Sequence, residues 1–157
     1  VIELRANFEK VNRAKKKIEK ENKLLAAQSE TDPLTGMANR RKLNIRADEM
    51  FSRAHKCGHN FAIEILDVDY FKEYNDNYGH QEGDRCLIAI AGCISEVAGA
   101  HGGFCARYGG DEFVVIYENI SKEDAKEYVE ELRHKVMELA LPHRFSKKSI
   151  KDSSLFH

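Results

Sequence analysis

The sequence contains no run of apolar residues long enough to cross a bilayer, and its charges nearly cancel. Of its 157 residues, 42% are hydrophobic and 32% are charged, with a formal net charge of −1. A transmembrane helix needs about 20 consecutive apolar residues, so this stretch of chain is not expected to span a membrane. The near-zero net charge offers no broad basic field, so nucleic acid is not an expected partner. The composition is typical of a globular domain with a core of its own.

The chain also lacks a recognisable signal peptide, an internal repeat and any Cys-x-x-Cys pair. It begins at Val1 rather than at Met, so we expect that the natural N-terminus is missing from this stretch. The four cysteines are not spaced as metal ligands, and the interpretation we prefer is buried free thiols in a reducing cytoplasm. We therefore expect a cytoplasmic domain, and the sequence leaves open whether the full-length protein is tethered to a membrane.

Residues 1–30 differ from the rest because apolar side chains recur in them every seven positions. One seam position holds Leu4, Val11, Ile18 and Leu25, and the other holds Val1, Phe8, Lys15 and Asn22. This pattern predicts a short coiled coil that joins two copies of the chain, and a helix of this kind is typical of a connector from something upstream. The polar residues Lys15 and Asn22 would weaken the pairing while favouring one register. The alternative is a single amphipathic helix that rests on its own domain.

Beyond residue 31, helical and strand patterns alternate. Asp32-Pro33 and Gly36 mark a turn, after which Asn39 is placed to cap a helix through about residue 56. We expect strands at 60–71, 104–108 and 112–118, and helices at 71–77, 82–98 and about 121–141. Gly109-Gly110 would form a hairpin turn in which both glycines supply positive φ. This order of elements predicts an α+β domain with a mainly antiparallel sheet.

Acidic residues fall at the end of one predicted strand and at the tip of the predicted hairpin. Asp67 and Asp69 end the first strand, and Asp111 and Glu112 follow the two hairpin glycines. Mg²⁺ binds one or two carboxylates together with phosphate oxygens of a substrate, so these acids form a candidate metal site. A solvated turn with no ligand is the alternative, and spacing alone does not decide between the two.

Three motifs along the chain are specific both in their residues and in their order. "DPLTGMANRRKL" (32–43) is followed by "LDVDYFKEYNDNYGHQEGD" (66–84) and by "RYGGDEF" (107–113). Together they resemble the GGDEF family of diguanylate cyclases over residues 32 to about 141. The resemblance implies a palm-like fold, ferredoxin-like and similar to adenylyl cyclases, with helices flanking a central antiparallel sheet. It also implies condensation of two GTP into cyclic di-GMP with loss of two pyrophosphates, by two domains that face each other.

The resemblance assigns roles to the acidic residues. Asp67 and Asp111 would bind Mg²⁺ or Mn²⁺, with help from the Val68 carbonyl and from Glu112. Asp111 and Glu112 would be the catalytic pair, with Glu112 assisting metal binding or deprotonation of the ribose 3′-hydroxyl. Such deprotonation by a carboxylate is chemically sound, because nearby cations lower the pKa of the hydroxyl.

The resemblance also implies a set of nucleotide contacts. The amides of Tyr70 and Phe71 and the side chain of Lys72 would face the phosphates. Asn75 and Asp84 would bind the edge of guanine, whose donors and acceptors suit an amide and a carboxylate. Gly109 and Gly110 would leave room for the nucleotide.

Other residues of the motifs have structural interpretations. We expect Asp69 to order its turn and His80 to be structural. We expect Asp32 to pair with Arg40 and Arg107 to support the hairpin.

Two departures from the family pattern bear on activity. Ala100 and Gly103 stand where an inhibitory cyclic di-GMP site would have arginine and aspartate, so no such site is expected. The family continues past its last helix with a further strand and a basic helix, whereas here residues 31–157 would form the domain without them. The alternative function is therefore a catalytically impaired module that binds GTP for regulation or dimerisation.

Overall fold

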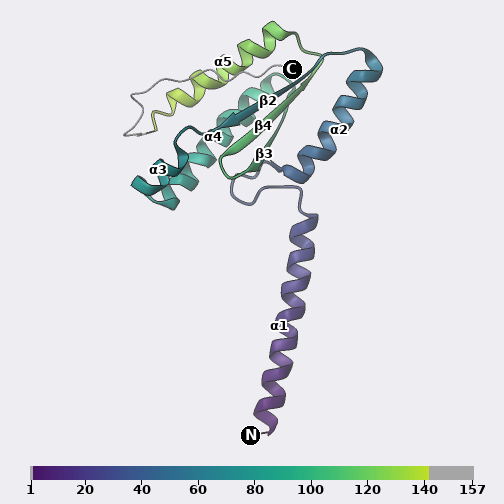
Figure 1. Cartoon of the computed structure of the whole chain (residues 1–157), viewed down its shortest axis with the longest axis vertical. Coiled ribbons are helices and arrows are strands. Elements are labelled where there is room, and N and C mark those ends of the chain that lie inside the picture. Colours follow the sequence, from purple (N-terminus) through teal and green to yellow (C-terminus); the bar gives the residue numbers. More distant parts are fainter. Residues whose placement is uncertain (1, 142–157) are drawn as a thin grey trace. The chain divides into compact units, whose positions relative to one another are not determined.

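A computed structural model of the chain describes residues 2–141 (Figure 1). It contains two compact units, and the boundary between them falls between Glu30 and Thr31. The assignment of residues 1–30 as a signalling helix and of residues 31–157 as the catalytic domain stays a prediction. The tail from Pro142 onward, and the expectation that a C-terminal strand and helix are missing, lie outside the described residues.

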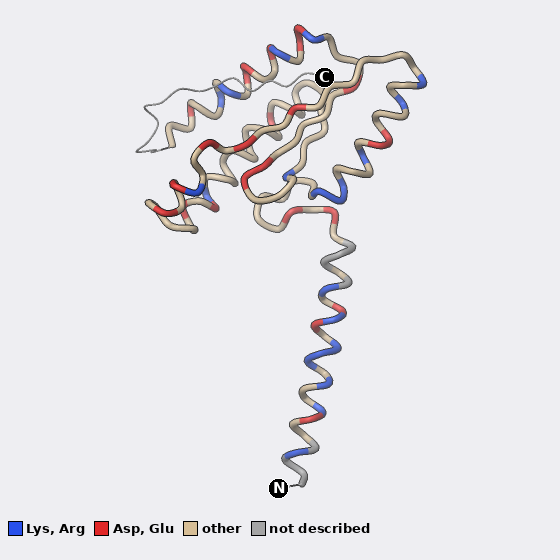
Figure 2. The backbone as a smooth tube through the Cα atoms, viewed as in Figure 1, with Lys and Arg blue, Asp and Glu red and all other residues tan. Residues whose placement is uncertain are grey.

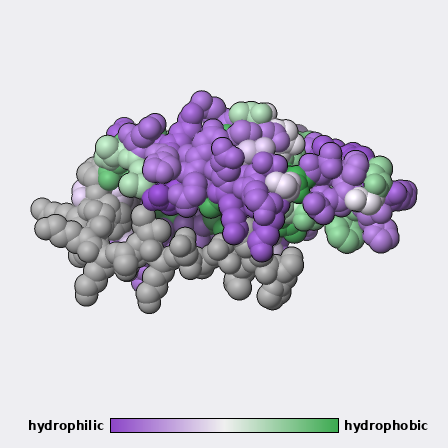
Figure 3. Space-filling view, turned by 90° about the horizontal axis from the view of Figure 1, so that it is seen from above, coloured by the Kyte–Doolittle hydropathy of each residue, from purple (hydrophilic) through white to green (hydrophobic). Residues whose placement is uncertain are grey.

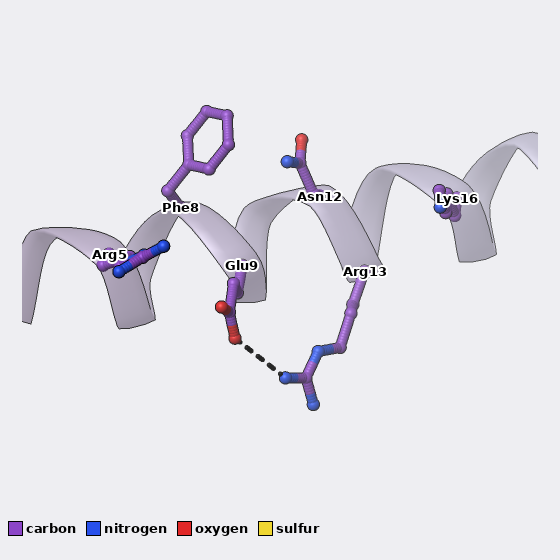
Figure 4. A pocket seen from close by; sticks show the side chains of 6 residues that line it. All are labelled: Arg5, Phe8, Glu9, Asn12, Arg13 and Lys16. Carbon is purple, nitrogen blue, oxygen red and sulfur yellow. Dashed lines mark hydrogen bonds and ion pairs between the residues drawn. The ribbon is translucent and has the colours of Figure 1, made fainter.

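The first unit is a single helix, α1 (Ile2–Gln28). Four of its predicted seam side chains are between 55% and 67% exposed: Phe8, Val11, Ile18 and Leu25. Basic and acidic positions are interspersed along its backbone in Figure 2, and Arg13 lies 3.3 Å from Glu9 one turn away. Figure 4 shows this ion pair and Phe8 on opposite sides of the helix. A surface hollow at this place is lined by residues of this helix alone. The coiled coil itself stays a prediction.

The second unit is built on a four-stranded sheet in the order β1-β3-β4-β2. Its strands are β1 (Ala38–Asn39), β2 (Phe61–Asp67), β3 (Phe104–Gly109) and β4 (Glu112–Glu118). β4 pairs antiparallel with both β2 and β3, as expected. β1 pairs parallel with β3, which sequence reasoning missed because a two-residue strand has no pattern of its own. The predicted α+β class is confirmed, and β2 ends at Asp67 rather than at residue 71.

Four helices accompany this sheet: α2 (Arg40–Cys57), α3 (Phe71–Tyr78), α4 (His80–Ala100) and α5 (Lys122–Glu138). The predicted caps are confirmed, because the Asn39 side chain accepts from the Lys42 amide and Ser121 from the Asp124 amide, each at 3.0 Å. α5 ends three residues before the predicted Leu141.

The sheet has a hydrophobic core on each face. α4 and α5 cover one face, where Leu87 and Ile94 pack with Phe113 and Val115 of β4. α2 covers the other face, where Leu43 and Met50 pack with Ala106, Val114 and Ile116. Figure 1 shows α2 and α5 on opposite sides of the strands. The surface seen from above in Figure 3 is mostly hydrophilic, with small apolar patches.

β2 forms one edge of this sheet as far as the described residues go. Ile63 and Ile65, which point to the α2 side, are 54% and 73% exposed. Glu64 points the other way, and both of its carboxylate oxygens are buried without a hydrogen-bond partner. Burial raises the pKa of Glu64 to about 7. This strand therefore combines exposed apolar side chains with a buried acid.

The turn before β1 is fixed by an ion pair that differs from the predicted one. Asp32 pairs with Arg107 of β3 at 3.0 Å, not with Arg40. The Arg40 guanidinium instead lies 4.4 Å from the centre of the Tyr108 ring, a cation–π contact. Burial opposes ionisation of Asp32, but hydrogen bonds from Thr35 and Arg107 outweigh it and lower the pKa of this carboxyl.

All four cysteines are free thiols, as expected, but only Cys86 and Cys93 are buried. Cys57, at the exposed C-terminal end of α2, is not, and Cys105 is half-buried. None of the helices within residues 2–141 combines the length and the apolar content that crossing a bilayer requires.

Candidate metal and nucleotide site

The acidic residues of β2 and β4 lie at the same end of the sheet, and acidic positions mark this end in Figure 2. The antiparallel register places Asp67 opposite Glu112. Burial raises the pKa of Asp67, and the negative charges of Asp111, Glu112 and Asp69 raise it further. The structure therefore places the carboxylates of the predicted metal ligands close enough together for their negative charges to repel one another.

The turn between β3 and β4 holds these acids in place. The Arg107 guanidinium donates to the Gly110 carbonyl from Nε at 2.9 Å and from Nη2 at 2.6 Å. This confirms the prediction that Arg107 supports the hairpin. Gly110 has φ of +55°, whereas Gly109 does not adopt positive φ, so only one of the two glycines is needed for the turn. A Cβ atom added at either glycine would meet open space, so this backbone is accessible to a ligand.

The donor set suits a hard divalent cation that is completed by phosphate oxygens. Among the described residues, no group of three or more His, Cys, Asp or Glu side chains is close enough to hold a metal. Mg²⁺ does not need such a cage, because it takes one or two carboxylates and fills its remaining positions with water and substrate oxygens. The mutual repulsion of Asp67, Asp111 and Glu112 is the kind of charge that a cation would neutralise.

The turn from β2 into α3 departs from the prediction at one position. Tyr70 has φ of +58°, a left-handed conformation that costs free energy for a residue with a side chain. The Phe71 amide, expected to face phosphates, donates instead to the Val68 carbonyl at 3.2 Å. The expected phosphate contact and the expected metal ligand are therefore hydrogen-bonded to each other. The Val68 carbonyl oxygen still has a second lone pair that can bind a cation. Lys72 is exposed on the first turn of α3.

The two predicted guanine-binding residues come from neighbouring helices. Asn75 lies on α3 and Asp84 on the first turns of α4. Asn75 packs against Gly83, the residue before Asp84, because a Cβ atom added to that glycine would lie only 1.8 Å from Asn75 Oδ1. This oxygen is buried and has no hydrogen-bond partner, whereas Asp84 is exposed. The structure thus places an unsatisfied acceptor against Gly83, the residue that precedes the exposed Asp84.

Sequence reasoning missed two features of this region. The first is Gly83, for which the available signal was a glycine inside a helical pattern. The second is an apolar pocket of about 340 Å³ between the β2–α3 turn, α4 and the end of α5. It is lined by Val68, Asp69, Tyr74, Cys86, Ile90, Val136, Met137, Ala140 and Leu141. No sequence pattern could reveal this pocket, because its walls come from segments far apart in the chain.

Comparison with known proteins places these features in a family. Residues 29–155 match the family described as "Diguanylate cyclase, GGDEF domain". Diguanylate cyclase DgcP of Pseudomonas aeruginosa is 41% identical over 103 residues, which are 66% of this chain and 15% of that protein. Diguanylate cyclase DgcP of Escherichia coli is 36% identical over 115 residues, covering 73% of this chain and 33% of that protein. The chain thus spans about a third or less of the length of these curated relatives.

Solved structures agree with the sequence matches. The coiled coil and GGDEF domain of DgcB from Caulobacter crescentus, in complex with c-di-GMP, aligns with a TM-score of 0.69 and 30% identity. That alignment covers 91% of this chain and 74% of the other. Diguanylate cyclase SiaD of Pseudomonas aeruginosa, in complex with its activator SiaC, aligns with a TM-score of 0.65 and 34% identity over 82% of this chain and 51% of the other. The fold, the three ordered motifs and these matches together show that the chain belongs to the GGDEF family of diguanylate cyclases.

Proposed function

We propose that this chain is the catalytic domain of a diguanylate cyclase, which condenses two GTP into cyclic di-GMP and two pyrophosphates. The observation that carries the proposal is the register of β2 and β4, which sets Asp67 opposite Glu112 and beside Asp111. Synthesis of cyclic di-GMP is the activity for which the matched relatives are named.

The acidic residues of this chain supply the metal and proton chemistry. Asp67, Asp111, Glu112 and the Val68 carbonyl would hold Mg²⁺ or Mn²⁺. A bound cation lowers the pKa of the ribose 3′-hydroxyl and neutralises charge on the leaving pyrophosphate. Glu112 accepts the 3′-hydroxyl proton, the 3′-oxygen forms a bond to the α-phosphorus of the facing GTP, and the bond from that phosphorus to pyrophosphate breaks.

The remaining contacts position GTP. Lys72, at the start of α3, places a positive charge near the phosphates, and the Tyr70 and Phe71 amides lie in the same turn. For Phe71 this requires that its amide leave the Val68 carbonyl when phosphate binds. Asn75 and Asp84 bind guanine, and Gly109 and Gly110 admit the nucleotide to the backbone.

Each domain binds one GTP, so turnover requires a dimer. The exposed apolar side chains of α1 support pairing of two chains through this helix under the control of an upstream sensor. We place the domain in the cytoplasm, where GTP is available, whatever anchors the rest of the protein.

The decisive experiment is incubation of the purified protein with GTP and Mg²⁺ at high protein concentration, with chromatographic detection of cyclic di-GMP. We expect product that disappears on removal of the metal. GTP-dependent thermal stabilisation without product would favour the alternative, a regulatory module that binds GTP without turnover. The Phe71 amide, an expected phosphate contact, donates its hydrogen bond to the Val68 carbonyl instead. This observation favours the alternative.

A further inference from the structure

Helices α3 and α4 touch at a position where any side chain larger than hydrogen would collide. A Cβ atom on Gly83 would lie 1.8 Å from Oδ1 and 2.9 Å from Cγ of Asn75, and 3.3 Å from the Phe71 ring. Real Cβ contacts are not this short, so a methyl group at residue 83 would force the Asn75 side chain to move. The absence of a side chain at Gly83 therefore defines where the Asn75 amide lies.

The oxygen of the same Asn75 side chain has no hydrogen-bond donor among the described residues. Asn75 Oδ1 is buried and accepts no hydrogen bond from any described group. A buried acceptor without a donor costs free energy, and a ligand that supplies an N–H would remove this cost. Guanine carries an amino group and a ring N–H on one edge, whereas adenine lacks that pair of adjacent donors.

Other glycines of α4 are not constrained in this way. A Cβ atom added to Gly92 or Gly99 would have nothing within 4 Å. Because glycine lowers helix stability relative to alanine, its use at the buried position 83 requires a local reason. The contact with Asn75 supplies that reason.

We propose that Gly83 is a specificity-determining residue of the nucleotide site. By having no side chain, it lets Asn75 hold its unsatisfied oxygen beside Asp84, where the two groups together select guanine over adenine. This inference rests on the proposed function, because it takes guanine as the base that Asn75 and Asp84 bind. Gly83 acts through Asn75 and touches no reacting atom, so it is a positioning residue.

The test compares nucleotide affinities of the full chain carrying Gly83→Ala, Asn75→Ala, or both. The probes are the α,β-methylene analogues of GTP and ATP with Mg²⁺, which bind without releasing pyrophosphate, and the measurement is calorimetric titration. Gly92→Ala in the same helix is the matched control, since it adds the same methyl group in open space.

We expect Gly83→Ala to weaken the GTP analogue by about tenfold, the discrimination of one base contact, and to leave the ATP analogue within about twofold. Gly92→Ala should match the wild type for both nucleotides. In the Asn75→Ala background, Gly83→Ala should have little further effect, because the group through which it acts is gone.

Several results would overturn the inference. Gly83→Ala that binds the GTP analogue like the wild type, weakens both nucleotides equally, or adds fully to Asn75→Ala would show that residue 83 does not act through the amide. Wild-type protein that binds the GTP analogue no better than the ATP analogue would overturn the proposed function, and this inference with it.

A folding defect in Gly83→Ala would be equally decisive. If the single variant unfolds while the double variant folds, the clash with Asn75 is established and the double variant should bind like Asn75→Ala. If both unfold, residue 83 is limited by something other than the Asn75 side chain, and the inference is wrong.

Discussion

Arg107 and Asp32 form an ion pair of 3.0 Å although 75 residues separate them in sequence. The same guanidinium donates twice to the Gly110 carbonyl, one residue before Asp111. The first turn of the second unit is thereby connected, through one side chain, to the turn that presents the acids. Both partners are largely shielded from water, with side chains 13% and 18% exposed, so this pair is stronger than a surface ion pair.

The first prediction concerns this connection. Arg107→Lys keeps the charge but cannot bond Asp32 and the Gly110 carbonyl with one planar fork, so we expect turnover to fall by about 10- to 100-fold through misplacement of the acids. Arg107→Ala should also lower the free energy of unfolding by about 1–3 kcal/mol, because Asp32 loses a charged partner. Steady-state kinetics and urea denaturation measure the two effects.

Arg133→Ala is the control, since its pair with Glu130 is exposed and local to α5. We expect a stability change within about 0.5 kcal/mol for this variant. Turnover by Arg107→Lys equal to that of the wild type would show that the turn is fixed without the bidentate contact.

The second prediction is a loss of metal dependence in Asp111→Asn. Removing one of the charges that repel Asp67 and bind the cation should abolish the extra thermal stabilisation that Mg²⁺ gives to the GTP complex. Glu112→Gln should instead keep GTP binding and lower turnover by about 10²- to 10⁴-fold, as expected for a lost general base. Differential scanning fluorimetry and product assays measure these changes.

Asp69→Asn provides the comparison for both variants. Asp69 neighbours Asp67 but is expected only to order its turn, so Mg²⁺ dependence should persist. Unchanged Mg²⁺ affinity in Asp111→Asn would refute the assignment of Asp111 as a ligand.

The third prediction concerns Glu64 and pH. The pKa of Glu64 is about 7 in the folded protein and 4.5 as the reference value for the unfolded chain. The folded state therefore binds more protons than the unfolded state between these values, so the contribution of Glu64 to stability is full below about pH 4.5 and is lost as pH rises through 7. The difference corresponds to roughly 3 kcal/mol at most.

Replacement of Glu64 by leucine should remove this loss. Glu64→Leu should stabilise the protein at pH 8 by up to about 3 kcal/mol and have a much smaller effect at pH 4.5, as measured by urea denaturation at each pH. The exposed Glu127→Gln should leave the pH dependence unchanged. Equal effects of Glu64→Leu at both pH values would show that the carboxyl is solvated in the folded state.

The fourth prediction tests the seam of α1. Ile18→Asp places a charge where two helices would pack, so we expect dimers to dissociate in sedimentation velocity and turnover to fall in parallel. Lys20→Asp, on the opposite side of the heptad, should leave the dimer intact. A persistently dimeric Ile18→Asp would exclude this seam.

The fifth prediction is the absence of product feedback at a separate site. Ala100 and Gly103 provide no charge for cyclic di-GMP, and a Cβ atom on Gly103 would lie 2.5 Å from the Tyr117 ring. Any inhibition by added cyclic di-GMP should therefore be competitive with GTP. Non-competitive inhibition in initial-rate measurements would reveal a second site elsewhere.

Much of the fold was predictable because its signals are local. The caps at Asn39 and Ser121 and the apolar strands on either side of Gly109-Gly110 depend on neighbouring residues, and they appear where expected. β1 was not predictable, since its two residues become a strand only by pairing with β3. The partner of Asp32 was wrong for the same reason: Arg40 is near in sequence, whereas Arg107 is near in space.

The candidate site likewise has parts that the sequence predicted and parts that it did not. The resemblance of the motifs predicted which acids form the site. The structure brings Asp67 and Glu112 together because they are opposite each other on the adjacent strands β2 and β4. The bond from the Phe71 amide to Val68 and the contact of Asn75 with Gly83 depend on backbone torsions and helix packing, which no residue pattern encodes.

The outer edge of β2 has a practical consequence for anyone handling this polypeptide. Within residues 2–141 no strand pairs with the backbone donors and acceptors of this edge, and Ile63 and Ile65 of the same strand are exposed. Such an edge templates the addition of foreign strands, which is how soluble domains begin to precipitate. We therefore expect concentrated solutions of the protein to aggregate at temperatures below that of its unfolding, and Ile65→Lys to suppress this aggregation.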